Sequence, residues 1–576
     1  MISYKLSVQQ ASSHYIDVEM CIDAVASDAL ALQLPAWRPG RYELGNFAKN
    51  IKALKAFDES GKELLYAKET KDRWVFQTKG VKTVKVSYSY FTSEINAGSC
   101  YADDTQLYVN PVHLCMYVPE RMQEKHVIEL DVPANYKVAG SLQIEVHKLT
   151  AAHFDELADS PFMAGSRLQS DYYECGGVKF WLHFQGECKP DMERIKKDFV
   201  AFTETQLRFW GSIPVNEYHF LFQILPYKFY HGVEHQKSTV IALGPGYALN
   251  RGKTYEDFLG VSSHELFHTW NIKYIRPAEM LPYDFTKENY ARTGYVYEGF
   301  TTYYGDLMLW ASGVFTDEQY YDTLEERLLK HFHNYGRFNL SVAASSWDTW
   351  LDGYVPGAPY RKTSIYDEGN LVAFMLDVMI RKYSGGKHAL SDVCRKLYTD
   401  YGKQNKGYSE SDVISICEEM AGISLQSFFS DIVYGTQSYE PQLKACFDFV
   451  GLDMVKVPGV HPAERDFGFK TTEHGLIRKV SMVAPGSPAW DAGIGIGDDI
   501  LSVNGYSLKN DLDEWLNYFA AEAVFLMVQS GGKLKEVELK KVQEQRYFDV
   551  IRLRAKTTLS PEEAQNAKNW QYGMSR

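Results

Sequence analysis

The residues His264-Glu265-Leu266-Phe267-His268 could bind a metal ion and use it for hydrolysis. On a helix, positions i and i+4 lie on one face, so both imidazoles can bind the same ion. Glu265 directly follows the first ligand, where its carboxylate can take a proton from a water molecule bound to that ion. The spacing predicts a metal-dependent hydrolase with His264 and His268 as ligands and Glu265 as general base.

A catalytic zinc usually takes three protein ligands and keeps one position for water, so another segment must supply a third ligand. Glu288 lies 20 residues beyond His268, a separation typical of thermolysin-like enzymes, but its surroundings are polar and turn-like. Glu298 precedes an apolar stretch, residues 300–310, that is typical of a buried helix. Because a ligand needs a rigid element, we predict one zinc ion per chain, with Glu298 as the third ligand.

The elements that must position these residues change in character along the chain. Residues 84–90 alternate between apolar and polar side chains, as in a half-buried strand, and similar runs recur from the N-terminus onward. Further strand-like runs are followed by a long region of helical periodicity, which is typical of an α+β domain. The predicted parts are a β-rich domain at 1–165, a catalytic domain at 166–453, a third domain at 454–545 and a partly helical tail at 546–576.

Length and charge exclude some classes of protein. The 576 residues suffice for about three to four domains. The formal net charge is −13, and the sequence contains no basic stripe, so we expect no nucleic-acid partner. No apolar run reaches about 20 residues, and the N-terminus lacks the apolar stretch of a secretory signal. We therefore expect no membrane segment and a cytoplasmic location, while a periplasmic one stays open.

Several segments resemble one family. The run from His264 to Pro277, HELFHTWNIKYIRP, is similar to the zinc motif of the glycyl aminopeptidase family of gluzincin metallopeptidases. Leu34–Tyr42, LPAWRPGRY, and Phe47–Ile51, FAKNI, resemble the signature of its N-terminal domain. The resemblance implies a multidomain α+β protein with a β-rich N-terminal domain, a thermolysin-like catalytic domain with a helical extension, and a PDZ domain. It also implies removal of N-terminal Gly or Ala from peptides.

The segment Gly232-Val233-Glu234 follows a predicted strand and could form an edge that pairs with an extended peptide. Glu234 would then bind the free α-ammonium group of that peptide. The segment resembles the G-x-M-E-N element of related aminopeptidases, with Val233 and His235 in place of Met and Asn. We predict all three residues of the segment to bind substrate.

Tyr366 could donate a hydrogen bond to the oxyanion of the tetrahedral intermediate. Tyr366-Asp367-Glu368-Gly369 resembles the Tyr-x-Lys-Gly element of related aminopeptidases, although Glu368 stands where Lys is expected. We predict Tyr366 as a catalytic residue, with three other tyrosines as rivals: Tyr303, Tyr304 and Tyr360.

Residues 484–505 resemble the core of a bacterial PDZ domain, with a helix start, a tight turn and a strand that ends at Asn504-Gly505. The segment Phe467-Gly468-Phe469 would then form the carboxylate-binding loop. A PDZ domain binds an extended segment by adding it as a strand, so the groove could hold either a peptide or a segment of the chain itself.

Three functions compete on these observations. The leading one is a zinc aminopeptidase that acts on peptides with a free N-terminus and prefers Gly or Ala there. The second is a zinc endopeptidase that its PDZ domain guides to substrates. The third is a peptide-binding scaffold without catalysis, against which the intact zinc motif argues.

Overall fold

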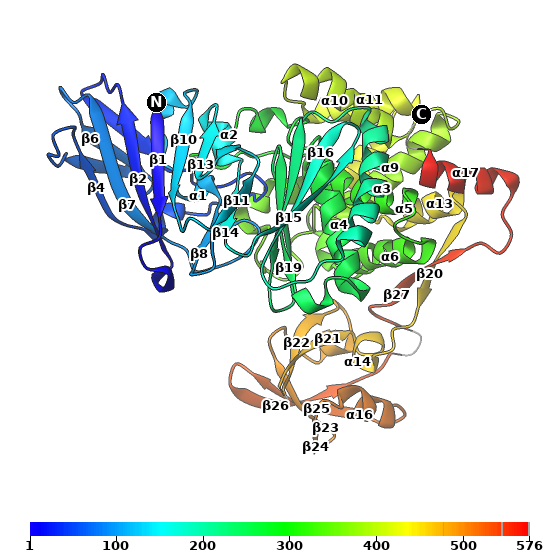
Figure 1. Cartoon of the computed structure of the whole chain (residues 1–576). Coiled ribbons are helices and arrows are strands. Elements are labelled where there is room, and N and C mark those ends of the chain that lie inside the picture. The colour runs from blue at the N-terminus through cyan, green and yellow to red at the C-terminus, as the bar shows by residue number, and fades with distance from the viewer. Residues whose placement is uncertain (476, 543–544, 574–576) are drawn as a thin grey trace. The chain divides into compact units, whose positions relative to one another are not determined.

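The computed structural model describes residues 1–475, 477–542 and 545–573, and its elements form a mixed α and β fold (Figure 1). No helix in these ranges is long and apolar enough to cross a lipid bilayer. Contacts divide the chain into two compact units. The first comprises Met1–Tyr320, Leu340–Gln437 and Lys568–Arg576, and the second comprises Tyr321–Asn339 and Ser438–Ala567.

The N-terminal part of the first unit is rich in strands (Figure 1, blue). Alternation of apolar and polar residues makes Thr83–Phe91 a strand with one buried face, β7. Its seven-stranded sheet has the order β12 (Gln143–Glu145), β13 (Lys148–Ala151), β10 (His126–Asp131), β1 (Ile2–Ser7), β2 (Tyr15–Asp23), β7 and β4 (Ile51–Phe57). Two smaller sheets follow the orders β3 (Ala29–Gln33), β6 (Arg73–Gln77), β5 (Tyr66–Thr70) and β11 (Lys137–Gly140), β14 (Phe162–Gly165), β9 (Gln106–Val109), β8 (Tyr101–Ala102).

One strand pair departs from the antiparallel pattern that the short strands and turns suggest. β1 and β10 are parallel, whereas the other neighbours in the large sheet are antiparallel. Alternation determines which face of a strand is buried, but it does not determine the direction of the neighbouring strand.

A five-stranded sheet positions one side of the site. Its order is β15 (Gln169–Cys175), β16 (Val178–Gln185), β17 (Glu217–Ile224), β19 (Ser238–Gly244) and β18 (Phe229–Glu234). β18 is therefore an edge strand, antiparallel to β19. Two long helices accompany this sheet, α3 (Met192–Trp210) and α4 (Gly252–Phe267).

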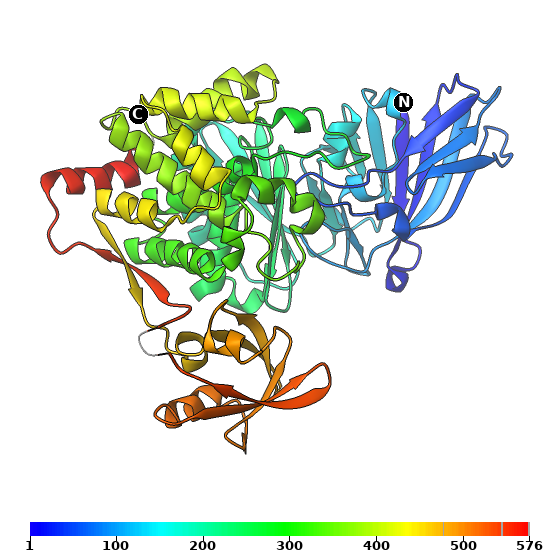
Figure 2. The same cartoon turned by 180° about the vertical axis from the view of Figure 1, so that it is seen from behind.

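Helices that pack on one another form the rest of this unit (Figures 1 and 2). They include η6 (Tyr295–Phe300), α5 (Thr301–Ala311), α9 (Asp367–Tyr383), α10 (Leu390–Asp400) and α11 (Glu410–Ala421). η6 and α9 meet through two glycines, because a Cβ added at Gly369 would lie 2.6 Å from the Cα of Gly299. Only glycine permits so close an approach, which holds the segment of Glu298 against the start of α9.

The second unit contains a strand pair and a small sheet domain. β20 (Leu452–Val457) pairs with β27 (Val550–Ala555), and the sheet domain lies between them in the sequence. Its elements are β21 (Phe469–His474), β22 (Ile477–Val483), α15 (Pro488–Asp491), β23 (Asp499–Val503), β24 (Tyr506–Ser507), α16 (Leu512–Tyr518), β25 (Val524–Ser530) and β26 (Lys533–Leu539). β27 lies within the segment expected to be a partly helical tail. That tail ends in helix α17 (Pro561–Tyr572).

Candidate active site

Three predicted ligand residues converge on one point. His264 lies in the last turn of α4, His268 caps that helix, and Glu298 lies in η6. The Nε2 atoms of the two histidines are 3.0 Å apart. Oε2 of Glu298 lies 3.3 Å from Nε2 of His268 and 3.8 Å from Nε2 of His264. The structure does not place Glu288 in this cluster, so Glu298 occupies the position expected of the third ligand.

The donors around this point fit a zinc ion. Two imidazole nitrogens and one carboxylate oxygen are a donor set that catalytic zinc takes. Nδ1 of His268 lies 2.6 Å from the carbonyl oxygen of Asn271, so a proton on Nδ1 leaves Nε2 open for a metal ion. Oε2 of Glu265 is buried without a hydrogen-bond partner. Such an orphaned carboxylate oxygen is typical of a site that holds water or an ion.

The charged groups of the site are buried together, and each changes the pKa of its neighbours. Burial raises the pKa of Glu265 well above its ordinary value, and the carboxylates of Glu234 and Glu298 raise it further. Burial also raises the pKa of Glu298. Burial alone would lower the pKa of His268. The carboxylates of Glu298 and Glu234 outweigh this effect and raise the pKa of His268 to about 9. Carboxylates this close to one another favour a bound cation.

Close packing of helices and strand holds the zinc-motif residues in place. A Cβ added at Gly305 of α5 would lie 3.0 Å from the Cα of His264, so the two helices approach closely there. Ser263 donates a hydrogen bond of 2.7 Å to the carbonyl of Gly305 and links them. On the other side, a side chain at Gly232 of β18 would collide with Oε1 of Glu265. The backbone of β18 therefore passes directly beside the predicted general base.

Glu234 is the last residue of β18, and it is 4% exposed. Its carboxylate belongs to a second group of ligand atoms with Glu265 and His268, all within 4.8 Å of one another. Within the described ranges no hydrogen bond reaches this carboxylate, although Gly40 lies close: a Cβ there would be 2.6 Å from Oε2. The side chain of Val233 is fully buried in a hydrophobic cluster, so only its backbone is available to a substrate.

Several tyrosines lie near Glu298. Tyr42 donates a hydrogen bond of 3.2 Å to Oε1 of Glu298. Tyr366 precedes α9 and packs with Tyr354 against the cluster that contains Tyr42. Burial raises the pKa of Tyr366 well above its ordinary value, and the carboxylate of Glu298 raises it further. Tyr366 is therefore protonated at neutral pH and can donate a hydrogen bond.

Tyr303, another candidate for this role, is hydrogen-bonded elsewhere. It donates a hydrogen bond of 2.9 Å to Asp377 and accepts one from Trp570. Tyr304 packs on Phe209 and Phe267, apart from the ligand cluster.

The predicted carboxylate loop of the sheet domain is partly engaged by its own chain. The N–H of Gly468 donates a hydrogen bond of 3.2 Å to the carbonyl of Glu464, in the short helix α14 (Pro462–Arg465). This helix contacts both β21 and α16, and Phe467 and Phe469 are buried in the domain core. A cavity of about 210 Å³ remains between these elements.

Sequence reasoning missed several residues of the site. Arg38, Gly40 and Tyr42 appeared only within a segment that carries a family resemblance, without a role. Asp159 and Lys273, an ion pair next to the end of β18, were also missed. The short stretch Arg38-Pro39-Gly40-Arg41-Tyr42 combines two cations with a turn signal. That combination of charges and a turn in a predicted β-domain could have indicated a functional loop.

Comparisons with known proteins found matches to family models and to solved structures. The family model "Peptidase M61 N-terminal domain" matches residues 3–166, "M61 glycyl aminopeptidase" matches residues 257–372 and "PDZ domain" matches residues 479–529. The crystal structure of an aminopeptidase N family protein from Idiomarina loihiensis is 26% identical, with a TM-score of 0.90 over 99% of this chain and 100% of that one. The structure of an M1 zinc metallopeptidase from Deinococcus radiodurans is 11% identical, with a TM-score of 0.45 over 77% and 92% of the two chains. A search of curated proteins found no match.

The fold and the site together define a metallopeptidase of the aminopeptidase type. Models of the M61 glycyl aminopeptidase family match its N-terminal and catalytic parts, and a PDZ domain model matches the part that follows. The predicted family and fold class are thereby confirmed.

Proposed function

We propose that this aminopeptidase binds one zinc ion through His264, His268 and Glu298 and removes small N-terminal residues, Gly or Ala, from peptides. The observation that carries the proposal is the position of Glu234. Its buried carboxylate ends an edge strand and lies within 4.8 Å of the ligand atoms of Glu265 and His268. A carboxylate there can bind a free α-ammonium group one residue away from the reacting carbonyl.

Each residue of the site then has one task. Zinc, when bound, supplies a Lewis acid that polarises the carbonyl group and lowers the pKa of water. Glu265 takes the proton of the attacking water and passes it to the leaving amine. Tyr366 donates a hydrogen bond to the oxygen of the scissile carbonyl as negative charge develops on it. The peptide pairs with the backbone of β18 at Gly232 and Val233 and places its ammonium group at Glu234.

The preference for small residues is supported by the rings near Glu234. Tyr42 is buried and Tyr366 is half-buried, and the charge of Glu234 contributes to raising the pKa of both. Aromatic rings that border the ammonium site favour a first residue with little or no side chain. The family name, glycyl aminopeptidase, supports the same preference.

Acetylating the N-terminus of a Gly-initiated tripeptide is expected to lower kcat/KM at least about 30-fold, because the buried carboxylate of Glu234 loses its charged partner. The measurement is release of the first residue from paired free and acetylated peptides. Equal cleavage of both peptides would support the PDZ-guided endopeptidase instead. Neither cleavage nor stoichiometric zinc, measured by mass spectrometry, would support the scaffold.

Replacing Tyr366 with phenylalanine is expected to lower kcat about 10²- to 10³-fold with little change in KM, because the hydrogen bond forms to charge that develops in the transition state. Steady-state kinetics and zinc analysis of the Tyr366→Phe variant measure this effect. Tyr303→Phe removes the same hydroxyl from the rival residue and serves as the matched control. If that control loses the activity and Tyr366→Phe retains it, the assignment of Tyr366 is wrong.

A further inference from the structure

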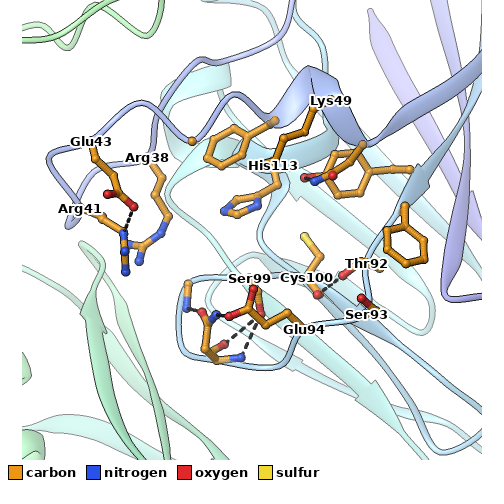
Figure 3. Close-up of a pocket in the computed structure, with 17 residues that line it drawn as sticks. Arg38, Arg41, Glu43, Lys49, Thr92, Ser93, Glu94, Ser99, Cys100 and His113 are labelled. Carbon is orange, nitrogen blue, oxygen red and sulfur yellow. Dashed lines mark hydrogen bonds and ion pairs between the residues drawn. The ribbon is translucent and has the colours of Figure 1, made fainter. Parts of the chain in front are cut away.

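A polar cavity of about 320 Å³ lies in the β-rich part of the first unit, beside the residues that contact Glu234 and Glu298. Figure 3 shows Arg38 and Arg41 at one end of it, with Lys49 and His113 further along its wall. The carboxylate of Glu43 is paired with Arg41, and Glu94 lies on the opposite wall (Figure 3). Nothing in the catalytic scheme above uses this cavity.

Arg38 is a buried cation whose donors are largely unused. The residue is 5% exposed, and its guanidinium lies directly over Gly98, where any side chain would collide with it. A guanidinium has five N–H groups, and the hydrogen bond that Arg38 makes within the described ranges runs to the carbonyl of Pro39 at 3.4 Å. Buried charges are normally paired. The charge of Glu234 acts on the guanidinium, but no hydrogen bond joins the two side chains in the described part of the chain. Arg38 lines the cavity, which therefore suits an anion.

A second polar atom on the wall also lacks a partner. Nε2 of His113 is buried without a hydrogen bond, and its ring stacks on Phe47 at 3.9 Å between centroids. The ring also has a hydrogen-bond contribution from the backbone of Gly98, so Arg38 is the group on this wall with donors to spare.

The edge strand β18 relates this cavity to the course of the substrate. A peptide whose N-terminus lies at Glu234 and that pairs along β18 must run antiparallel to it, toward Phe229. Glu265 lies beside Gly232, so the bond to be cleaved lies there. The next residue, His231, is close to the two guanidinium groups: burial lowers its pKa to about 3, and Arg38 and Arg41 contribute to this. The guanidinium of Arg38 lies over Gly98, and the adjacent Ala97 packs in one hydrophobic cluster with Val233 and Phe229, on either side of His231. The residues after the cleaved bond therefore approach Arg38 and Arg41.

We propose that Arg38, assisted by Arg41, binds a carboxylate of the substrate on the C-terminal side of the cleaved bond. The proposal rests on the proposed function, because it takes the substrate N-terminus to lie at Glu234. The carboxylate is either the free C-terminus of a short peptide or an acidic side chain. Because one extended residue spans about 3.3 Å, the C-terminus of a di- or tripeptide lies within about 7 Å of the residue that pairs with Gly232, on the side of His231.

The test compares three substrates: Gly-Gly-Gly with a free C-terminus, its C-terminal amide, and the amide of Gly-Gly-Asp. The wild-type protein is expected to show kcat/KM about tenfold higher for the free acid than for its amide, as for one charge-assisted pair. In Arg38→Gln this ratio falls toward one, and Arg38→Lys restores part of it. Lys79→Gln removes a positive charge from an exposed turn and is expected to leave the ratio unchanged. Circular dichroism shows whether each variant is folded.

The outcomes separate the two proposals. A high rate for the Gly-Gly-Asp amide shows that an acidic side chain can replace the C-terminus, whereas a low rate restricts the site to the α-carboxylate. Equal rates for all three substrates, or an equal loss on all three in Arg38→Gln, overturn the carboxylate site and leave the aminopeptidase intact. If no peptide is cleaved, calorimetric binding of Gly-Gly-Gly and of its amide to the Glu265→Gln variant still decides whether Arg38 recognises the carboxylate.

Discussion

Replacing Glu265 with glutamine is expected to lower kcat about 10²- to 10⁴-fold, which is the range that a general acid–base residue contributes. Glutamine has the shape of glutamate but cannot accept the proton of the attacking water. Burial raises the pKa of Glu265, so in the wild-type protein this carboxylate has a high proton affinity. The zinc content should stay at one ion per chain, because Glu265 is not one of the three proposed ligands.

The controls for this prediction lie on the same helix. Glu256→Gln changes a residue of α4 that accepts a hydrogen bond from Gln319, and it is expected to leave kcat within about twofold of the wild-type value. His268→Ala should lose zinc and activity together, because it removes a proposed ligand. A Glu265→Gln protein that has lost its zinc and yet hydrolyses peptides at the wild-type rate would show that these roles are wrong.

Replacing Asp159 with asparagine is expected to destabilise the protein by about 3–5 kcal/mol, the cost of leaving a buried charge without its partner. The ammonium group of Lys273 lies 2.8 Å from Asp159, and the side chain of Lys273 is only 1% exposed. Asp159 also accepts a hydrogen bond of 2.8 Å from the backbone of Gln236 and lies 3.1 Å from His235. His235 and Gln236 directly follow Glu234, so the change should also raise KM by loosening the end of β18.

The pH dependence of this effect follows from the pKa of each partner. Burial alone would raise the pKa of Asp159. Lys273 and His235 outweigh this effect and hold the pKa of Asp159 below its ordinary value. A depressed carboxyl pKa contributes stability that is present above the unfolded pKa of about 3.9 and is lost as the pH falls toward the folded pKa. The difference between wild type and Asp159→Asn should therefore be constant from about pH 5 to 8 and shrink below about pH 4.

Urea unfolding followed by tryptophan fluorescence measures this difference in the free energy of unfolding. The double variant Asp159→Asn/Lys273→Met removes both charges and is expected to recover most of the lost stability, because no unpaired charge remains buried. If the single and double variants are equally unstable, or the single variant matches the wild type at pH 7, the pair does not stabilise this region.

Much of the catalytic arrangement could be predicted because it is encoded locally. His264, Glu265 and His268 share one helix, so their spacing alone places them on one face. Glu298 could be preferred to Glu288 because apolar residues follow it, and the structure places it with the two histidines. The strand β27 could not be recognised in the tail, since it is completed by β20, about a hundred residues earlier in the chain.

Contacts between distant segments could not be predicted at all. Tyr42 and Glu298 are separated by 256 positions, and Asp159 and Lys273 by 114. An isolated tyrosine or aspartate in a β-rich segment has no local pattern that names such a partner. The same holds for Arg38, whose unused donors are visible only once the cavity around it exists.

The sequence by itself determined the helix that carries His264 and His268, the order of the matched domains and the class of enzyme, because each depends on residue types at short and regular spacing. The tertiary structure decided which carboxylate lies beside the two histidines, which tyrosines lie near it, and that the N-terminal domain places Gly40 and Tyr42 there. Those features depend on which surfaces meet when the chain packs. Burial then changes the charges and proton affinities of the groups that meet, and no local pattern of residues specifies this.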